Sequence, residues 1–88
     1  MYLHIGIDRV IDTEDILGIF DLDNTTVQKS SKEFLAQAEK SGEVENVCTD
    51  LPKSFVVCCK NGRKKVYITQ IASSTILKRM KEKYEALS

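Results

Sequence analysis

The chain has 88 residues, of which 42% are hydrophobic and 30% charged, and its basic and acidic side chains balance to a formal net charge of zero. This length excludes a second domain, because each half would be too short to fold alone, and this composition excludes a disordered tail. No apolar run approaches the ~20 residues that cross a bilayer and residues 1–8 lack the pattern of a signal peptide, so we expect one cytoplasmic domain over residues 1–88, away from membranes.

The N-terminal part predicts three strands. Residues 2–6 and residues 9–11 are two short β-rich runs around a turn that contains Gly6. After the polar break at residues 13–15, residues 16–20 are apolar on both faces, which predicts a central strand.

A helix is predicted next. Ser30 followed by Glu33 is the capping-box pattern, so the helix is expected to begin near Ser30. Its apolar face consists of Val27, Phe34, Leu35 and Ala38, and Gly42 is a natural C-terminal stop. Residues 43–50 then predict a loop or a weak edge strand, which Pro52 favours because it cannot donate to a sheet.

Residues 55–69 contain the clearest local pattern. Asn61 and Gly62 separate two β-rich runs and form the preferred two-residue hairpin turn, in which both residues need a positive φ. Pairing Lys60 with Arg63 then puts Val57 opposite Val66. One face of this hairpin contains Phe55, Val57, Cys59, Lys64, Val66 and Ile68. The other contains Val56, Cys58, Lys60, Arg63, Lys65, Tyr67 and Thr69, so it has an apolar root and a basic end.

The chain ends in a second predicted helix. Ser73 and Ser74 offer N-terminal caps, and an apolar stripe follows at helical spacing. The stripe consists of Ile76, Leu77, Met80, Tyr84 and Leu87. Together these elements predict an α+β domain with a mainly antiparallel sheet, a β-hairpin finger and two helices.

Charge is distributed unevenly along the chain. Residues 1–50 carry four basic and eleven acidic side chains, whereas residues 51–81 carry eight basic side chains and no acidic one. This asymmetry is typical of proteins that meet a polyanion on one face, and of subunits that join through opposite charges. A lysine-rich hairpin tip can also serve solubility alone. We expect the finger and the last helix to bring their cations side by side, and the candidates for contact with DNA phosphates are Lys53, Lys60, Arg63, Lys64, Lys65, Lys78 and Arg79.

One motif suggests an enzyme. Residues 19–25 match the hydrophobic run and D-x-D-x-T pattern of haloacid-dehalogenase-type phosphatases, in which Asp21 would be the nucleophile. Such enzymes need a further carboxylate pair for Mg²⁺, and residues 51–81 contain no acid. The segment also fails as a calcium loop because its twelfth position is Lys32 rather than glutamate. We interpret it as a strand end and a turn, and we predict no enzyme and no small-molecule substrate.

The cysteines predict neither disulfides nor a metal site. Cys48, Cys58 and Cys59 are an odd number without a C-x-x-C pair, and His4 is distant from them in sequence. We expect small buried thiols in a reducing compartment and no cofactor.

Four segments, in their order and spacing, resemble a known family. They are residues 2–6 (YLHIG), 16–21 (ILGIFD), 52–57 (PKSFVV) and 73–75 (SST), and they resemble the small bacterial extracellular-matrix regulators RemA and RemB, most closely the RemB branch. The resemblance covers nearly the whole chain. It implies a cytosolic DNA-binding regulator of biofilm matrix genes, with subunits assembled into a ring on which DNA lies.

The chain departs from the RemA branch at one place. That branch carries an arginine pair tied to DNA binding just before the strand that corresponds to residues 55–59, and here Leu51 and Pro52 stand there. The candidate cations therefore rest on charge and not on the resemblance.

Two functions are compatible with these observations. The first is a homo-oligomeric regulator of transcription that contacts the phosphates of double-stranded DNA through a basic surface. The alternative is a non-catalytic assembly module, whose basic window docks on the acidic surface of the next subunit or of a protein partner.

Overall fold

The computed structural model describes residues 1–6, 8–22, 28–48 and 50–87, with the side chains of 28–31 and 84–87 left out. Within these residues lie six strands, two α-helices and one 3₁₀ helix, which confirms the α+β class. The elements are β1 (Tyr2–His4), β2 (Val10–Asp12), η1 (Thr13–Asp15), β3 (Ile16–Asp21), α1 (Gln28–Lys40), β4 (Val44–Asn46), β5 (Ser54–Lys60), β6 (Arg63–Thr69) and α2 (Ser73–Leu87).

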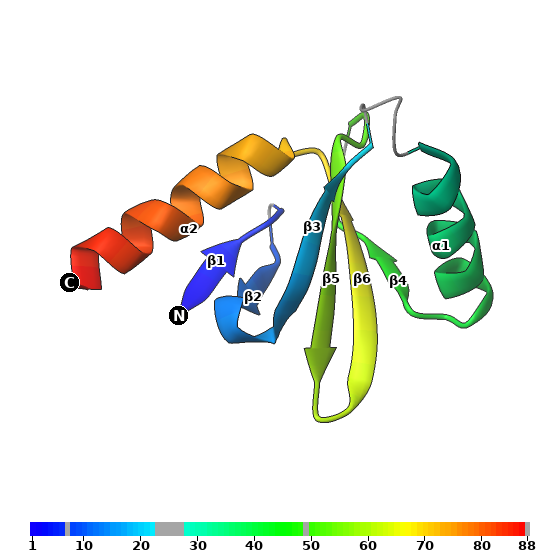
Figure 1. Cartoon of the computed structure of the whole chain (residues 1–88), viewed down its shortest axis with the longest axis horizontal. Coiled ribbons are helices and arrows are strands. Elements are labelled where there is room, and N and C mark those ends of the chain that lie inside the picture. Colours follow the sequence, from blue (N-terminus) through cyan, green and yellow to red (C-terminus); the bar gives the residue numbers. More distant parts are fainter. Residues whose placement is uncertain (7, 23–27, 49, 88) are drawn as a thin grey trace.

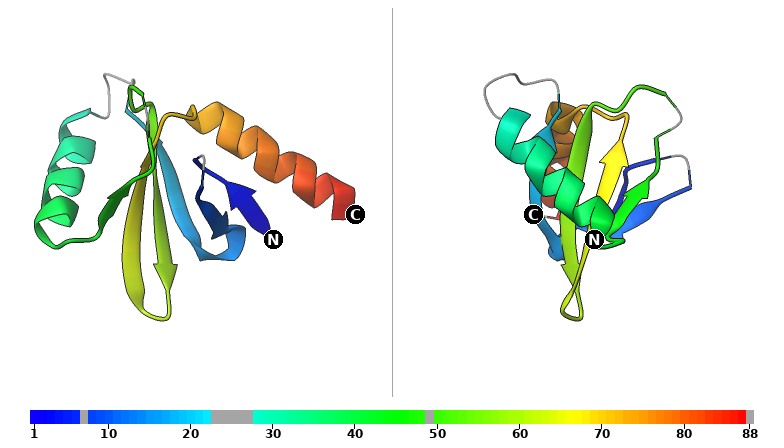
Figure 2. Two further views of the ribbon diagram at one scale, coloured as in Figure 1. Left: turned by 180° about the vertical axis from the view of Figure 1, so that it is seen from behind. Right: turned by 90° about the vertical axis from the view of Figure 1, so that its right-hand side faces the viewer.

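The hairpin of β5 and β6 has the predicted register. Lys60 pairs with Arg63, and Val57 pairs with Val66. Asn61 and Gly62 have φ values of 53° and 78°, as a two-residue type I′ turn requires. The tip of the hairpin projects beyond the rest of the molecule in Figures 1 and 2, and we call residues 58–65 the finger.

Four strands form a mixed sheet in the order β3-β5-β6-β4. β4 runs parallel to β6, and the β3–β5 and β5–β6 pairs are antiparallel, so the expected mainly antiparallel sheet is confirmed. The weak edge strand predicted within residues 43–50 is β4.

The central position predicted for residues 16–20 is wrong, because β3 lies at the edge of the sheet. Its two-sided apolar pattern has a different origin. Ile16 and Ile19 pack into the core, whereas Phe20 lies on the other face and stacks on Phe55 at 5.0 Å between ring centroids. Leu17 remains 69% exposed beside a β-bulge.

A separate hydrophobic core covers each face of the sheet. Figure 1 shows α1 on one side of the sheet and the β1–β2 ribbon with α2 on the other. On one face α1 packs its Phe34 and Ala38 against β5 and β6. On the other face, a ribbon of β1 and β2 packs together with α2, and Leu3 and Ile76 are fully buried there. β5 is therefore covered on both sides. The predicted division of the hairpin is confirmed, since Phe55, Val57, Val66 and Ile68 belong to one cluster and Val56, Cys58 and Tyr67 to the other.

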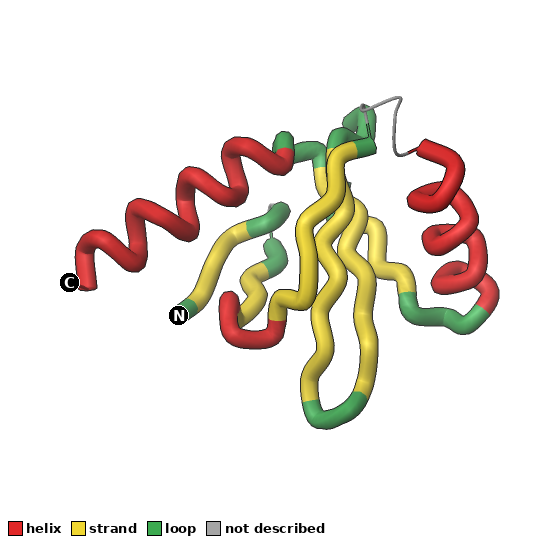
Figure 3. Tube along the Cα trace, in the orientation of Figure 1, coloured by secondary structure: helices red, strands yellow, loops and turns green. Residues whose placement is uncertain are grey.

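The β1–β2 ribbon is tied to the sheet by a buried hydrogen bond. The Thr69 hydroxyl donates to the Ile5 carbonyl at 2.5 Å, and the same oxygen accepts from the Ile71 N–H at 3.1 Å. Thr69 is fully buried, so this hydroxyl satisfies polar groups that lie away from water. The ribbon and η1 lie between the sheet and α2 in Figure 3.

Both helices begin earlier than their serines predict. α1 begins at Gln28, so Ser30 lies inside the helix, and Val27 lies outside the described residues. In α2 the Ile76 N–H donates to the Ala72 carbonyl at 3.1 Å, which makes Ala72 the N-cap in place of Ser73 or Ser74.

The predicted stripe of α2 is only partly buried. Ile76 is buried and Met80 packs against the core, but Leu77 is 54% exposed. The side chains of Tyr84 and Leu87 lie outside the described part of the chain. α2 packs on a narrow ribbon and not on a broad sheet, so one row of its apolar residues is enough to fill the contact.

Of the three thiols that the sequence predicts to be buried, only Cys58 is buried. Burial, with a smaller effect of the Asp15 charge, raises its pKa to about 11. Cys58 is therefore protonated at neutral pH and behaves as a small apolar residue. Cys48 and Cys59 are half-buried, and all three cysteines are free.

Candidate nucleic-acid interface

The finger divides its four cations between two faces. Lys60, Arg63 and Lys65 lie on the side of the β1–β2 ribbon, and Lys64 lies on the side of α1, as strand alternation requires. All four side chains are exposed. The buried root of the hairpin holds them on a rigid strand pair instead of a loop.

Two of these cations already face carboxylates from the acidic half of the chain. Lys64 lies 4.0 Å from Glu43 and places its ammonium 5.2 Å from the centre of the Phe34 ring. Lys65 lies 3.2 Å from Glu45. The lysines are exposed and the glutamates are half-buried. Ion pairs at a protein surface contribute roughly 0–1 kcal/mol, so an incoming phosphate can compete with the carboxylate.

Arg9 joins this group although no sequence pattern marks it as a site residue. Its guanidinium pairs with Glu45, the same carboxylate that Lys65 contacts. Arg9 and Lys65 each lie 5.9 Å from the centre of the Tyr67 ring. The parallel pairing of β4 with β6 sets Glu45 beside Tyr67, and nothing in the local sequence predicts that register.

Lys60 and Arg63 are the freest cations of the finger. They face each other across the turn, and neither forms an ion pair with any residue that the structure describes. Lys60 still acts at a distance. The pKa of Asp12 is lowered chiefly by the hydrogen bond that its carboxylate accepts from the Glu14 N–H, then by the N-terminal amino group, and also by the Lys60 charge.

The expected continuous surface between the finger and α2 is not formed within one chain. Lys53 precedes β5, whose seven residues rise about 3.3 Å each, so it lies roughly 20 Å from the tip of the finger. Its N–H donates to the Thr69 carbonyl at the end of the sheet from which α2 leaves. In Figure 1, α2 diverges from the finger, and it carries Lys78 and Arg79 away with it. The seven candidates therefore do not form one surface, since four lie on the finger and Lys53, Lys78 and Arg79 lie elsewhere.

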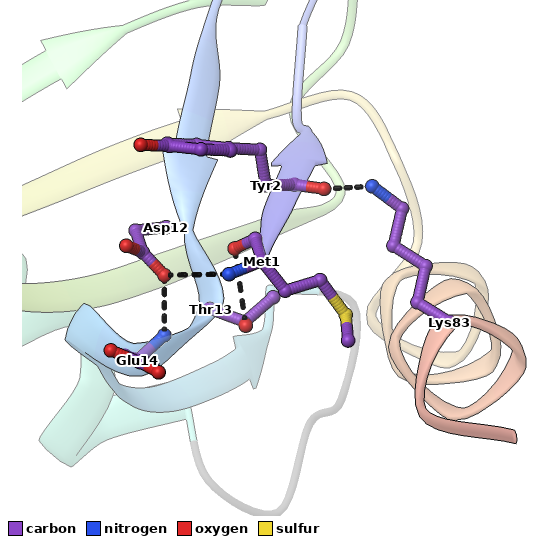
Figure 4. Close-up of polar contacts among 6 residues, drawn as sticks. All are labelled: Met1, Tyr2, Asp12, Thr13, Glu14 and Lys83. Carbon is purple, nitrogen blue, oxygen red and sulfur yellow. Dashed lines mark hydrogen bonds and ion pairs between the residues drawn. The ribbon is translucent and has the colours of Figure 1, made fainter. Parts of the chain in front are cut away.

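α2 directs two of its cations to the edge of β1. Arg79 donates to the His4 carbonyl at 3.5 Å, and Lys83 donates to the Tyr2 carbonyl, as Figure 4 shows for Lys83. Residues four apart on a helix are separated by about 6 Å along its axis, and carbonyls two residues apart on a strand by about 6–7 Å. The spacing of Arg79 and Lys83 therefore matches that of the His4 and Tyr2 carbonyls. Arg79 is thus engaged in holding α2 on the ribbon, whereas exposed Lys78 has no ion pair among the described residues.

The acidic half does not face away from the finger. Glu43 and Glu45 pair with lysines of β6, and Asp12 and Asp15 line a pocket together with three cations of the finger. The opposite charges of the two halves therefore meet inside one chain, at the base of the finger.

Comparisons with known proteins identify one similar regulator. The chain is 38% identical over 85 residues to the Extracellular matrix regulatory protein B of Bacillus subtilis (strain 168), and the match covers 97% of this chain and 96% of that protein. No model of a known protein family matches. Within the part of the chain that the structure describes, neither helix is long and apolar enough to cross a membrane.

Proposed function

Since this chain belongs to the RemA/RemB family of bacterial extracellular-matrix regulators and to its RemB branch, we propose that it regulates matrix genes in the cytoplasm by binding double-stranded DNA. In this proposal the contacts are made to phosphates through the finger, and the active form is a homo-oligomeric ring. The name of the Bacillus relative describes regulation and no reaction, in keeping with a protein that is not an enzyme.

One observation carries the proposal: the finger projects from the body and presents Lys60 and Arg63 without an ion-paired carboxylate among the described residues. Because the hairpin backbone is already ordered, only the side chains of these cations lose conformational freedom when they meet a backbone phosphate. Lys64 and Lys65 add weakly paired charges on either side. The finger replaces the broader seven-residue surface as the proposed contact region, with Lys53, Lys78 and Arg79 as candidates only where neighbouring subunits bring them close.

The uncovered edge of the sheet supports self-association. β3 has no strand partner on its outer side among the described residues, and Leu17 and Phe20 are exposed along it. Edge strands with exposed apolar side chains are places where another chain pairs. A contact between this edge and a different surface of the next copy is head-to-tail, and a head-to-tail contact closes into a ring when its rotation allows.

Salt dependence tests the DNA contact. Fluorescence anisotropy with a mixed-sequence duplex should show affinity falling by orders of magnitude between about 50 and 200 mM salt, because each phosphate contact releases counterions. Changing Arg63, Lys64 and Lys65 together to alanine should flatten this dependence. The slope of log K against log salt should fall by about 0.9 for each phosphate that the variant no longer neutralises.

A single exchange provides the matched comparison. Arg63→Gln should lower the slope by about one contact, whereas Lys40→Gln, the same charge change on α1, should leave it unchanged. Binding that is indifferent to salt, or equally sensitive to both exchanges, would count against a finger that contacts phosphates.

The alternative, an assembly module, is favoured by the ion pairs of Lys64 with Glu43 and of Lys65 with Glu45. These pairs show that the basic and acidic segments are complementary, and a neighbouring subunit offers the same acids. Sedimentation velocity at low and high salt separates the two functions. An oligomer that dissociates in high salt, in a protein that binds no duplex at low salt, would assign the charges to assembly.

A further inference from the structure

A pocket of about 140 Å³ lies between the β1–β2 ribbon and the finger. This volume is below the ~300–1,000 Å³ of a typical ligand pocket, so the pocket can enclose only part of a ligand and the rest must lie at its rim. Its lining comes from both halves of the chain and comprises Tyr2, Val10, Ile11, Asp12, Asp15, Cys58, Lys60, Arg63, Lys65 and Tyr67.

One wall of the pocket is cationic. Lys60, Arg63 and Lys65 lie on the same face of the finger and all line the pocket. Lys65 is held by Glu45, but Lys60 and Arg63 have no ion pair among the described residues. The planar guanidinium of Arg63 offers paired N–H donors that match a phosphate group.

The opposite wall is anionic. Asp12 is engaged by the Glu14 N–H at 3.0 Å and by the N-terminal amino group at 3.4 Å, as Figure 4 shows. The carboxylate of Asp15 has no hydrogen bond or ion pair among the residues that the structure describes. It can therefore accept a hydrogen bond from a donor group on a ligand.

This mixture of charges disfavours a DNA backbone in the pocket. A phosphodiester backbone of DNA presents acceptors and no hydroxyl donors, so Asp12 and Asp15 would repel it. A ligand suited to both walls needs an anionic group at one end and hydroxyl donors a short distance away. A ribose phosphate has both, with a free 2′,3′-diol beside its phosphate.

The rim of the pocket offers an aromatic surface. Tyr2 is 64% exposed, and its ring lies on the same side of the ribbon as Asp12 (Figure 4). Tyr67 is already approached by Arg9 and Lys65, so Tyr2 is the ring with free surface. A nucleobase stacks on such a ring irrespective of its identity, with a contribution of about 1–3 kcal/mol in single-strand complexes.

We propose that this pocket binds a ribonucleoside monophosphate. Arg63 and Lys60 hold the phosphate, Asp15 accepts from the ribose hydroxyls, and Tyr2 supports the base. Binding in the pocket does not depend on the proposed DNA contact, but it uses two of the same cations. The nucleotide therefore competes with DNA for Lys60 and Arg63, which makes the pocket a regulatory site if both proposals hold.

Isothermal titration calorimetry of the full chain tests the pocket directly with AMP, 2′,3′-dideoxy-AMP and inorganic phosphate as probes. AMP should bind about tenfold or more tightly than dideoxy-AMP, because only AMP supplies the diol. Arg63→Gln should weaken AMP about tenfold, and Tyr2→Leu should weaken AMP without affecting phosphate. Lys40→Gln on α1 is the matched control and should change nothing.

Asp15→Asn gives a result of opposite sign for the two ligands. Removing the charge should weaken AMP, because the neutral amide oxygen is a weaker acceptor for its hydroxyls than a carboxylate, and should strengthen inorganic phosphate, which loses a repelling neighbour. No heat with millimolar AMP, equal binding of AMP and dideoxy-AMP, or tighter AMP binding by Asp15→Asn would overturn the proposal. Circular dichroism of each variant confirms that it folds.

The duplex anisotropy assay separates the two proposals. AMP that binds by calorimetry while no duplex binds leaves the pocket standing and removes the DNA contact. A duplex that binds while AMP gives no heat leaves the DNA contact and removes the pocket.

Discussion

At the scale of single residues, two positions favour glycine because a side chain there would meet neighbouring atoms, and not because of turn geometry. A Cβ on Gly6 would lie 2.9 Å from the Val47 carbonyl oxygen, which is backbone. A Cβ on Gly18 would lie 2.8 Å from an atom of the Phe20 ring, which is a side chain at an exposed edge. The two positions therefore tolerate a methyl group differently.

Gly6→Ala should destabilise the fold by about 1–3 kcal/mol, because the ribbon must move away from the segment after β4. Gly18→Ala should have a smaller effect, since the Phe20 ring can swing outward. Urea unfolding followed by circular dichroism measures both. Equal effects, or a larger one at Gly18, would contradict the close approach of the ribbon to Val47.

The carboxylate of Asp12 links stability to pH. Its pKa is lowered in the folded state by the hydrogen bond from the Glu14 N–H, and then by the N-terminal amino group and Lys60. The ionised form is therefore the stabilising one. Its contribution is complete above the ordinary pKa of 3.8 and is lost as the pH falls through the lowered pKa.

Asp12→Asn keeps a side-chain oxygen that can cap η1 but removes the charge. The variant should melt below the wild type at pH 6, and the difference should disappear as the pH falls below the folded-state pKa. Thermal melts across this acidic range test the point. A difference that persists unchanged at the lowest pH would show that charge is not the cause.

At the scale of elements, the finger was predictable because its signals are local. Asn61 and Gly62 specify the turn, and the turn specifies every pair along the hairpin. The edge position of β3 and the parallel pairing of β4 were not predictable, because neighbours distant in sequence determine them. For the same reason the sequence identified the cations of the finger but neither Arg9 nor the carboxylates that face them.

Substitution of Gly62 in the turn of the finger tests the effect of backbone conformation alone. Gly62 has a φ of 78°, and a Cβ there would meet nothing within 4 Å. Gly62→Ala should therefore destabilise the hairpin by about 1–2 kcal/mol through backbone strain alone. Gly62→Asn should cost less, because asparagine visits this region more readily. Chemical denaturation of the two variants measures the difference, and a neutral Gly62→Ala would contradict the type I′ turn.

At the scale of the whole molecule, the exposed edge of β3 is the surface at which we expect another copy of the chain to bind. Leu17→Lys places a charge near the start of this edge strand, a change that blocks strand pairing in natural sheets. The variant should sediment as a monomer under conditions in which the wild type is an oligomer. Leu77→Lys, at an exposed leucine of α2, is the comparison and should leave the oligomer intact.

The reverse result would also be informative. Dissociation by Leu77→Lys but not by Leu17→Lys would move the interface to α2. A wild type that sediments as a monomer at all concentrations would contradict self-association itself.

The position of β6 has a consequence for synthesis of the chain. Of the six strands in the described residues, β6 is translated last, yet it lies between β5 and β4 and hydrogen-bonds to both. When synthesis has reached residue 60, β6 does not yet exist. β4 then has no strand partner, and one edge of β5 is unpaired. Both cores therefore close late and together, and a chain interrupted before Thr69 presents its apolar strands to chaperones and proteases.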